Sequence, residues 1–77
     1  MAKEYEFEVV EKYGVLSQRG KVTVELRKIR WNGGEEKYDI RRWSDEKPYK
    51  GISLDIVEMQ QLFIMLGNIL GVIDEEE

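Results

Sequence analysis

Residues 37–43, with the sequence Lys-Tyr-Asp-Ile-Arg-Arg-Trp, place basic side chains and an indole ring at alternating positions. In an extended strand, successive side chains point to opposite faces. Tyr38 and Ile40 would therefore share a face that can lie on a core. The other face would carry the candidates for chemistry: Lys37, Asp39, Arg41 and Trp43. Cations that neutralise phosphates, beside a flat ring that can stack on a base, are what a site for single-stranded nucleic acid needs.

The same residues have a simpler interpretation. A single Trp often caps one end of a hydrophobic core, and a charged strand face is most often only solvated. Trp43 nevertheless shares its parity with Lys37 and Arg41, which favours base stacking. We expect Asp39 to orient Arg41 or Lys37 through a charge-assisted hydrogen bond, because a carboxylate repels phosphate.

The charge of the chain is unevenly distributed around its net value of −4. Two Lys oppose four Glu in residues 1–18, ten Lys and Arg oppose six acids in residues 19–50, and residues 51–77 carry six acids alone. A basic middle segment is a candidate electrostatic footprint for nucleic acid. The predicted nucleic-acid contacts are Arg41, Trp43, Trp31, Lys37, Lys21, Arg30, Lys50 and Arg27.

Catalysis is not predicted. The chain has no Cys and no His, so the commonest nucleophilic thiol, general base and metal ligand are missing. The acids alternate along one strand or gather at the C-terminal end, and no glycine-rich phosphate loop precedes a helix. We therefore expect no metal, no cofactor and no small-molecule substrate. The chain also lacks an apolar run of membrane-spanning or secretion-signal length, so we expect a cytoplasmic protein with no membrane partner.

The alternation of apolar and polar residues predicts four strands. The first starts at Glu4 and passes a bend or bulge at Gly14, and residues 17–20 form a turn. The second covers residues 21–31, and its parity changes near Arg27–Lys28, which predicts a bulge there and leaves the facing of Trp31 ambiguous.

The remaining strands follow two further turn signals. Asn32-Gly33-Gly34 joins the second strand to residues 37–43 as a hairpin. Residues 44–48 are predicted to be a loop, because they are polar and end in Pro48, and residues 50–54 a short fourth strand.

A helix is predicted from Ile56 to Leu70, with Asp55 as its N-cap and Glu58 as the capping partner. The helix is more apolar than one packed face requires, so either its core stripe is wide or a second subunit covers it. We favour a homodimer, because a chain of 77 residues builds only a small core. The expected interface residues are Met59, Phe63, Met65, Leu66 and Ile69. The whole chain, 1–77, is predicted to be one domain, structured over about residues 4–70 and ending in an acidic tail at 71–77.

Five short segments in this order resemble the single-strand-binding domain of the transcriptional coactivator family of positive cofactor four, and still more its small bacterial YdbC-type relatives. The matching segments are Phe7–Val10, Gly14–Ser17, Trp31–Gly33, Lys37–Arg41 with Trp43, and Lys50–Leu54, which together lie within about residues 7 to 66. The resemblance implies a homodimer of curved antiparallel sheets, with the helices packed between the subunits on the side away from the ligand.

It also implies single-stranded DNA, or RNA, lying across the concave faces with little sequence preference. The Arg that follows Asp-Ile in the family, and a nearby Trp, contact the strand, which corresponds here to Arg41 and Trp43. An aromatic ring at the tip of the preceding strand does the same, and Trp31 is its nearest match.

The predicted fold is therefore α+β, a curved four-stranded antiparallel sheet followed by one C-terminal helix, in a homodimer. The predicted function is non-catalytic, largely sequence-independent binding of single-stranded nucleic acid in transcription, replication or repair, by base stacking and phosphate contacts. The alternative is a dimeric protein-interaction module without nucleic-acid contact, in which Trp43 is only structural.

Overall fold

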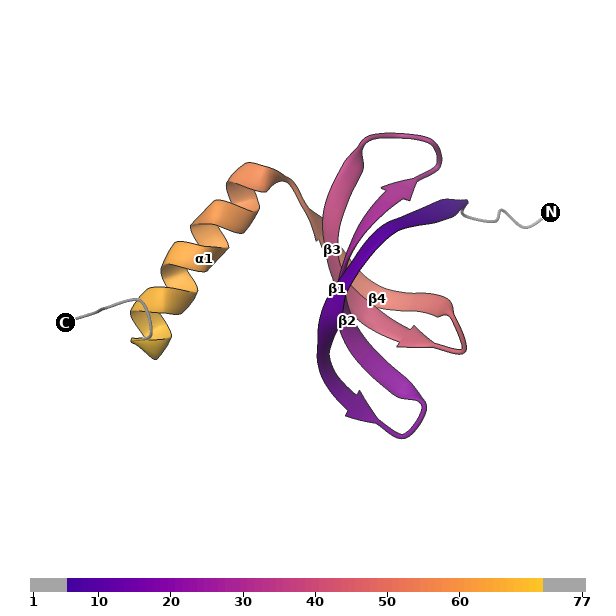
Figure 1. The fold of residues 1–77 in the computed structure, drawn as a ribbon, viewed down its shortest axis with the longest axis horizontal. Helices are drawn as coiled ribbons and strands as arrows, with labels where there is room; N and C mark the ends of the chain where they lie inside the picture. Colours follow the sequence, from indigo (N-terminus) through magenta and orange to yellow (C-terminus); the bar gives the residue numbers. More distant parts are fainter. Residues whose placement is uncertain (1–5, 72–77) are drawn as a thin grey trace.

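The computed structural model describes residues 6–71 and contains one sheet and one helix. The elements are β1 (Phe7–Arg19), β2 (Val22–Trp31), β3 (Glu36–Ser44), β4 (Lys47–Leu54) and α1 (Ile56–Leu70). Neighbouring strands are antiparallel in the order β1-β2-β3-β4 (Figure 1). The predicted α+β fold of four antiparallel strands and a C-terminal helix is confirmed. The expected strand start at Glu4 and the acidic tail lie outside the described residues.

Tight turns join the strands. Gly20, Asn32 and Gly33 adopt positive φ, at the two places where the sequence predicts turns. The third turn corrects the prediction of a loop over residues 44–48: Asp45 and Glu46 take φ of 53° and 64° and close a two-residue hairpin. β4 therefore begins at Lys47 rather than at residue 50. Neither residue is Gly or Asn, so the usual signal for such a turn is absent from the sequence.

The predicted bulge near Arg27–Lys28 is wrong. β2 pairs with β3 without a register shift from Val22, opposite Ser44, to Arg30, opposite Glu36. Register shifts lie between β1 and β2, where the pairing skips Val10, Tyr13 and Leu16 of β1, and between β3 and β4, at the step from Arg41 to Trp43. The pattern of β2 changes parity because one face of this strand begins with charged residues and ends with apolar ones, not because the strand slips.

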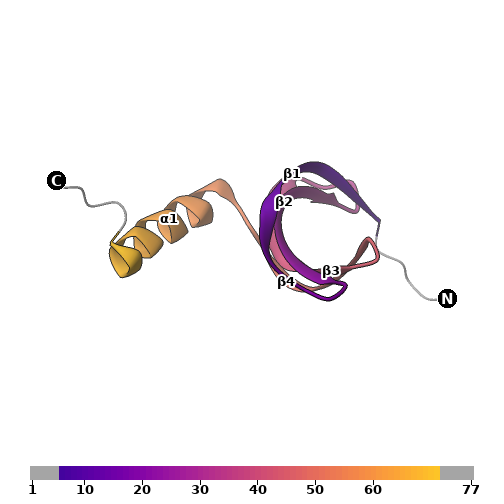
Figure 2. The same cartoon turned by 60° about the horizontal axis from the view of Figure 1, so that its bottom comes forward.

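The sheet curls around one of its faces, which we call the inner face (Figure 2). Cross-strand partners share a face, and the register places these side chains on the inner one: Phe7, Val9 and Lys12 of β1, Glu25, Arg27, Ile29 and Trp31 of β2, Lys37, Asp39, Arg41 and Trp43 of β3, and Pro48, Gly51 and Ser53 of β4. The most buried residues of the sheet all lie there: Ile29, Asp39, Trp43, Glu25 and Arg27.

This burial corrects the assignment of faces in residues 37–43. Tyr38 and Ile40, expected on the core, are only half-buried, whereas Asp39 and Trp43 are 0% and 2% exposed. The curvature explains the reversal, because a strongly curled sheet covers its inner side chains with its own neighbouring strands. Period-two alternation separates the two faces of a strand but does not tell which one the sheet will close over.

The helix forms as predicted but stands beside the sheet. The Asp55 carboxylate accepts the Glu58 backbone N–H and the Glu58 carboxylate accepts that of Asp55, so the capping box is confirmed. α1 touches the sheet mainly at β3 and β4, close to its connection (Figures 1 and 2). Its apolar side chains remain largely uncovered, with Phe63 64% and Ile69 75% exposed. In the part of the chain described, no helix is long and apolar enough to cross a membrane.

Candidate nucleic-acid interface

Four charged side chains form a checkerboard on the inner face of β2 and β3. Glu25 lies opposite Arg41, and Arg27 lies opposite Asp39. Each arginine pairs with the acid two residues earlier on its own strand: Arg27 Nη2 lies 2.6 Å from Glu25 Oε1, and Arg41 Nε lies 2.6 Å from Asp39 Oδ1. The four charges sum to zero, so these four side chains together supply no net electrostatic attraction for phosphate. The arrangement holds two planar guanidinium groups in fixed orientations.

Each of these arginines stacks on an indole of the other strand. The guanidinium carbon of Arg27, on β2, lies 3.8 Å from the ring centroid of Trp43, on β3. Reciprocally, that of Arg41, on β3, lies 4.8 Å from the ring centroid of Trp31, on β2. Both distances fall within the range of cation–π attraction. The face therefore contains two similar arrangements, which we name the Trp43 unit (Glu25, Arg27, Trp43) and the Trp31 unit (Asp39, Arg41, Trp31).

The Trp43 unit is closed. Glu25, Arg27 and Trp43 are 4%, 5% and 2% exposed. Besides the guanidinium of Arg27, the ring of Phe7 contacts Trp43, with centroids 5.7 Å apart. A base cannot stack on Trp43 in this arrangement unless Arg27 or Phe7 moves away. The core-capping interpretation thus describes the position of Trp43 better than the predicted stacking role does.

The carboxyl of Glu25 is held in its charged form. Burial acts to raise the pKa of Glu25, but hydrogen bonds from Thr23 and Arg27 and the positive charges of Arg27 and Lys12 outweigh burial and leave the pKa below its ordinary value. Lys12 Nζ lies 3.6 Å from Glu25 Oε1. The ion pair of the Trp43 unit is therefore intact at neutral pH.

This pKa shift predicts a loss of stability in acid. The unfolded chain protonates Glu25 more readily than the folded one, so the stability contributed by Glu25 is fully present above the ordinary pKa of 4.5 and is lost as the pH falls through the lower, folded-state pKa. Thermal unfolding should be measured between neutral and strongly acidic pH. The melting temperature of Glu25→Gln should fall less steeply with decreasing pH than that of the wild type. Glu35→Gln, in an exposed loop, is the control. Equal pH slopes in wild type and Glu25→Gln would contradict the assignment.

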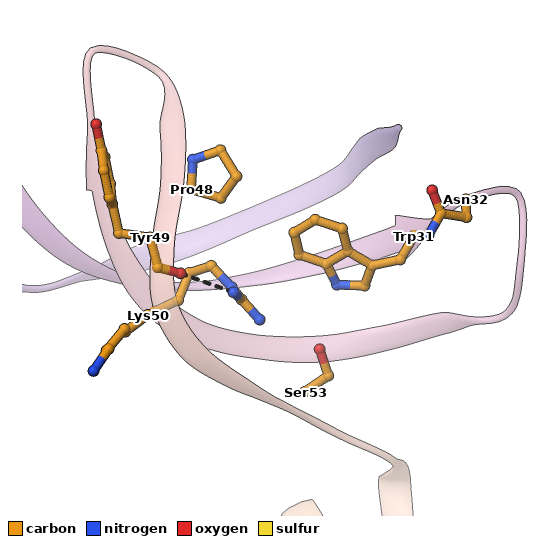
Figure 3. A pocket seen from close by; sticks show the side chains of 7 residues that line it. Trp31, Asn32, Pro48, Tyr49, Lys50 and Ser53 are labelled. Atoms are coloured by element: carbon orange, nitrogen blue, oxygen red, sulfur yellow. Dashed lines mark hydrogen bonds between the residues drawn. The ribbon is translucent and has the colours of Figure 1, made fainter. Parts of the chain in front are cut away.

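The Trp31 unit is open and borders a pocket of about 590 Å³ (Figure 3). The pocket is lined by Trp31, Asn32, Arg41, Pro48, Tyr49, Lys50 and Ser53. Trp31 is half-buried, and in Figure 3 its ring lies above Ser53, across the pocket from Pro48 and Tyr49. Cavities of this size with aromatic walls and a few fixed polar groups are typical of sites for small planar groups.

Arg41 is immobilised from three directions. Its Nε and Nη2 donate to the two carboxylate oxygens of Asp39 at 2.6 and 2.8 Å, and its Nη1 donates to the carbonyl of Tyr49 at 2.9 Å. Ser53 Oγ donates to Asp39 Oδ2 at 2.8 Å and completes the shell of the buried carboxylate. The expected orienting bond from Asp39 to Arg41 is confirmed. The guanidinium thus keeps its plane and direction without any ligand.

Gly51 on β4 makes room for Arg41. A Cβ on Gly51 would lie 1.9 Å from Arg41 Cβ and 2.4 Å from the Ile40 carbonyl oxygen. No larger residue fits at this cross-strand position unless β3 and β4 separate. Within the Lys50–Leu54 segment, Gly51 is therefore the residue that lets Arg41 lie against β4.

Gly51→Ala should consequently lower the free energy of unfolding by about 1–3 kcal/mol, as overpacking does, and weaken ligand binding because Arg41 must shift. Urea denaturation and an oligonucleotide titration would measure the two effects. Gly14→Ala in β1 is the matched control, because a Cβ there meets nothing within 4 Å. If both variants behave alike, Gly51 does not position Arg41.

The other predicted basic contacts are placed unequally. Lys37 is exposed on the inner face, Lys50 extends from the rim of the Trp31 pocket, and Lys21 lines a smaller pocket of about 170 Å³ beside the Trp43 unit. Arg30 lies on the outer face, where Glu8 and Glu36 bind it at 2.7 and 2.6 Å. The structure thus brings Lys37 and Lys50 to the face of Trp31 and Arg41, and places Arg30 away from it.

Phe7, Pro48 and Tyr49 belong to the site but were not predicted from the sequence. Phe7 lies 5.4 Å from Trp31 and 5.7 Å from Trp43, ring centroid to centroid, and so connects the two units. Phe7 lies on the apolar side of the first strand, and this position would have predicted its contact with the two indoles if the inner face had been recognised as the buried one. Pro48 and Tyr49 lie in a segment predicted to be mostly loop, so no pattern pointed to them.

The chain was compared with known proteins. No family model matches it. It is 40% identical, over 68 residues, to a protein of Treponema pallidum (strain Nichols) described as an uncharacterized protein, and the match covers 84% of this chain and 80% of that protein. The chain belongs to the same family as this protein. Since the match extends over most of both chains, the relationship concerns the whole sheet-and-helix unit rather than one motif.

Proposed function

We propose that this cytoplasmic protein binds single-stranded nucleic acid, DNA or RNA, without catalysis, on the inner face of its sheet. The observation that supports this most is the Trp31 unit: a half-exposed indole and a guanidinium that is already fixed in place at the edge of an open pocket. Aromatic rings and arginine planes are the platforms on which unpaired bases stack in such proteins. The resemblance to the positive cofactor four family points to the same ligand.

The charge around the pocket is consistent with a strand that runs past it. Lys37 and Lys50 are exposed and have no ion-pair partner among the described residues, so Lys37 on the inner face and Lys50 beside the pocket can both neutralise phosphates. Arg41 and Asp39 neutralise each other, so Arg41 acts through its plane and its remaining N–H groups. The roles therefore divide: lysines supply salt-dependent attraction, and the Trp31 unit supplies contact with the bases.

Binding of a fluorescently labelled oligo-thymidine, measured by polarisation over a series of salt concentrations, tests this function. We expect the logarithm of the affinity to fall linearly with the logarithm of salt. Lys50→Gln should reduce the slope by about one phosphate contact and leave the fold intact. Lys47→Gln, at the start of β4 and not among the residues that line the pocket, is the charge-matched control. Absence of binding at low salt would overturn the proposal.

We also propose that the protein is a homodimer in which a second copy covers α1. Phe63, Met65 and Ile69 are more than half exposed in the single chain, and Ile52 on the outer face of the sheet is 56% exposed. Exposed apolar surface on this scale marks an interface. Sedimentation should give the dimer mass at micromolar concentration, and Ile69→Lys should shift it toward the monomer. A wild-type monomer under these conditions would contradict the dimer.

The second candidate function is a protein-interaction module, which the same uncovered helix favours. In that case the inner face is only a polar core, and α1 receives a different partner. The two functions make opposite predictions for the oligo-thymidine titration. A folded dimer that binds no oligonucleotide would favour the interaction module.

A further inference from the structure

Tyr49 is the most exposed aromatic residue of the described sheet, with an exposed fraction of 53%. It lines the Trp31 pocket together with Pro48, and in Figure 3 both lie across the pocket from Trp31. Its ring forms no aromatic pair and no cation–π contact with the other described residues. Apolar surface bordered by polar groups is typical of a ligand-binding groove. The ring of Tyr49 is therefore accessible to a planar ligand.

The backbone of Tyr49, in contrast, is held in place. Its carbonyl accepts a hydrogen bond from Arg41 Nη1 at 2.9 Å, and Arg41 is itself bound to both carboxylate oxygens of the buried Asp39. In Figure 3 the dashed line marks the bond to the carbonyl, and the ring of Tyr49 extends away from the guanidinium. A tyrosine side chain has only two rotatable torsions, so a ring on an anchored backbone loses little conformational freedom when a ligand binds.

A β-bulge explains how Tyr49 comes to border the pocket. In the pairing of β3 with β4, Tyr49 and Lys50 lie opposite the single residue Arg42. The extra residue allows Pro48 and Gly51, three positions apart, to lie on the same inner face. Bulges of this kind change the direction of side chains and are common at sheet edges beside functional sites. β4 is an edge strand, so the side chain of Tyr49 lies where no further strand covers it.

The inner face offers few other rings to a bound strand. Stacking of successive bases on aromatic rings supplies the sequence-tolerant part of single-strand binding. Trp43 is 2% exposed and is covered by Arg27 and Phe7, so it provides no open surface for a base. Trp31 and Tyr49 are the two aromatic residues that line the pocket.

We propose that Tyr49 stacks on a base of the bound strand, as the second aromatic contact of the Trp31 pocket. This inference rests on the proposed function and adds a base-contacting residue to the same site. Every base has a π-face, so a contact through the ring of Tyr49 leaves the binding indifferent to sequence. The ring carries no charge, so it contributes affinity without contributing to the salt dependence that phosphate contacts produce.

Tyr49→Ala tests the proposal, because it removes the ring and keeps the backbone carbonyl that accepts from Arg41. In the polarisation assay with oligo-thymidine, the affinity should fall about five-fold or more, with the slope against salt unchanged. A strand of equal length in which every base is missing should bind the variant and the wild type alike, because it has nothing to stack. Tyr49→Phe keeps the ring and should bind oligo-thymidine as the wild type does.

The matched control is Tyr13→Ala, which removes an exposed tyrosine from β1, the opposite edge strand, and should leave the affinity unchanged. Unchanged affinity of Tyr49→Ala for oligo-thymidine, or equal losses for the thymidine and abasic strands, would overturn the inference and leave the proposed function standing. A lower mass of Tyr49→Ala in sedimentation would assign the ring to a subunit contact and would also overturn it. Failure of the wild type to bind oligo-thymidine at low salt would overturn the proposed function itself.

Discussion

Replacing Asp39 by alanine should lower the free energy of unfolding by about 3–5 kcal/mol, because removing one partner of a buried ion pair leaves the other without compensation. Asp39 is 0% exposed and accepts bonds from Arg41 Nε, Arg41 Nη2 and Ser53 Oγ. The side chain of Arg41 is only 15% exposed, so water can replace little of what it loses. The same substitution frees the guanidinium from its plane and should also weaken oligonucleotide binding.

Urea denaturation measures the loss of stability. Asp39→Asn keeps the shape and one acceptor, so its effect should be smaller than that of alanine. Glu36→Ala, an exposed acid at the start of β3, is the control and should cost little because surface ion pairs contribute little. An ordinary surface ion pair contributes less than about 1 kcal/mol. A loss of stability of that size in Asp39→Ala would mean that the buried pair of Asp39 and Arg41 does not stabilise the inner face.

Trp31→Ala should weaken binding of an oligo-thymidine by about 1–3 kcal/mol, roughly 5- to 150-fold, while stability changes much less. Arg41 and Phe7 contact the ring of Trp31 as Arg27 and Phe7 contact that of Trp43. Trp31, however, is half-buried and lines the open pocket, so the part of its ring on the pocket side is available to a base. Trp43→Ala should show the opposite pattern. Trp43 is 2% exposed, and truncating a buried aromatic residue costs about 3–5 kcal/mol of stability.

The two variants together distinguish the role of Trp31 from that of Trp43. Binding of each variant is measured at a temperature where unfolding curves show it to be folded, with Gln60→Ala, an exposed polar residue of α1 outside the proposed dimer interface, as a control. Loss of affinity in a folded Trp43→Ala protein, with Trp31→Ala unaffected, would transfer the stacking role to Trp43. It would also mean that Arg27 and Phe7 move aside when ligand binds.

The sequence predicts the parts of this fold that depend on neighbours along the chain. The capping residues Asp55 and Glu58 determine the start of α1, and glycines mark two of the three turns. The third turn escapes prediction because Asp45 and Glu46 adopt positive φ without Gly or Asn, under the constraint of the paired strands. Signals from neighbouring residues thus predict the helix start and two turns. At Asp45–Glu46, strand pairing determines the turn without such a signal.

The candidate site is harder to predict because it depends on curvature and register. Alternation correctly grouped Asp39, Arg41 and Trp43 on one face, but the burial of that face follows from the curl of the whole sheet. The stacking of Arg41 on Trp31 joins residues that are not cross-strand partners, since Arg41 lies opposite Glu25, so neither residue spacing nor strand pairing specifies it. The bond between Asp39 and Arg41, two residues apart, was within reach of sequence reasoning and was predicted.

The binding of single-stranded nucleic acid at the Trp31 unit is tested most directly by the fluorescence of Trp31 itself. In a Trp43→Phe variant, Trp31 is the remaining tryptophan, and its fluorescence is followed while oligo-thymidine is added at low salt. We expect saturable quenching whose midpoint moves to higher oligonucleotide concentration as salt is raised. Emission that stays unchanged at low salt, in a folded protein and at saturating oligonucleotide, would contradict the placement of single-stranded nucleic acid on the Trp31 unit.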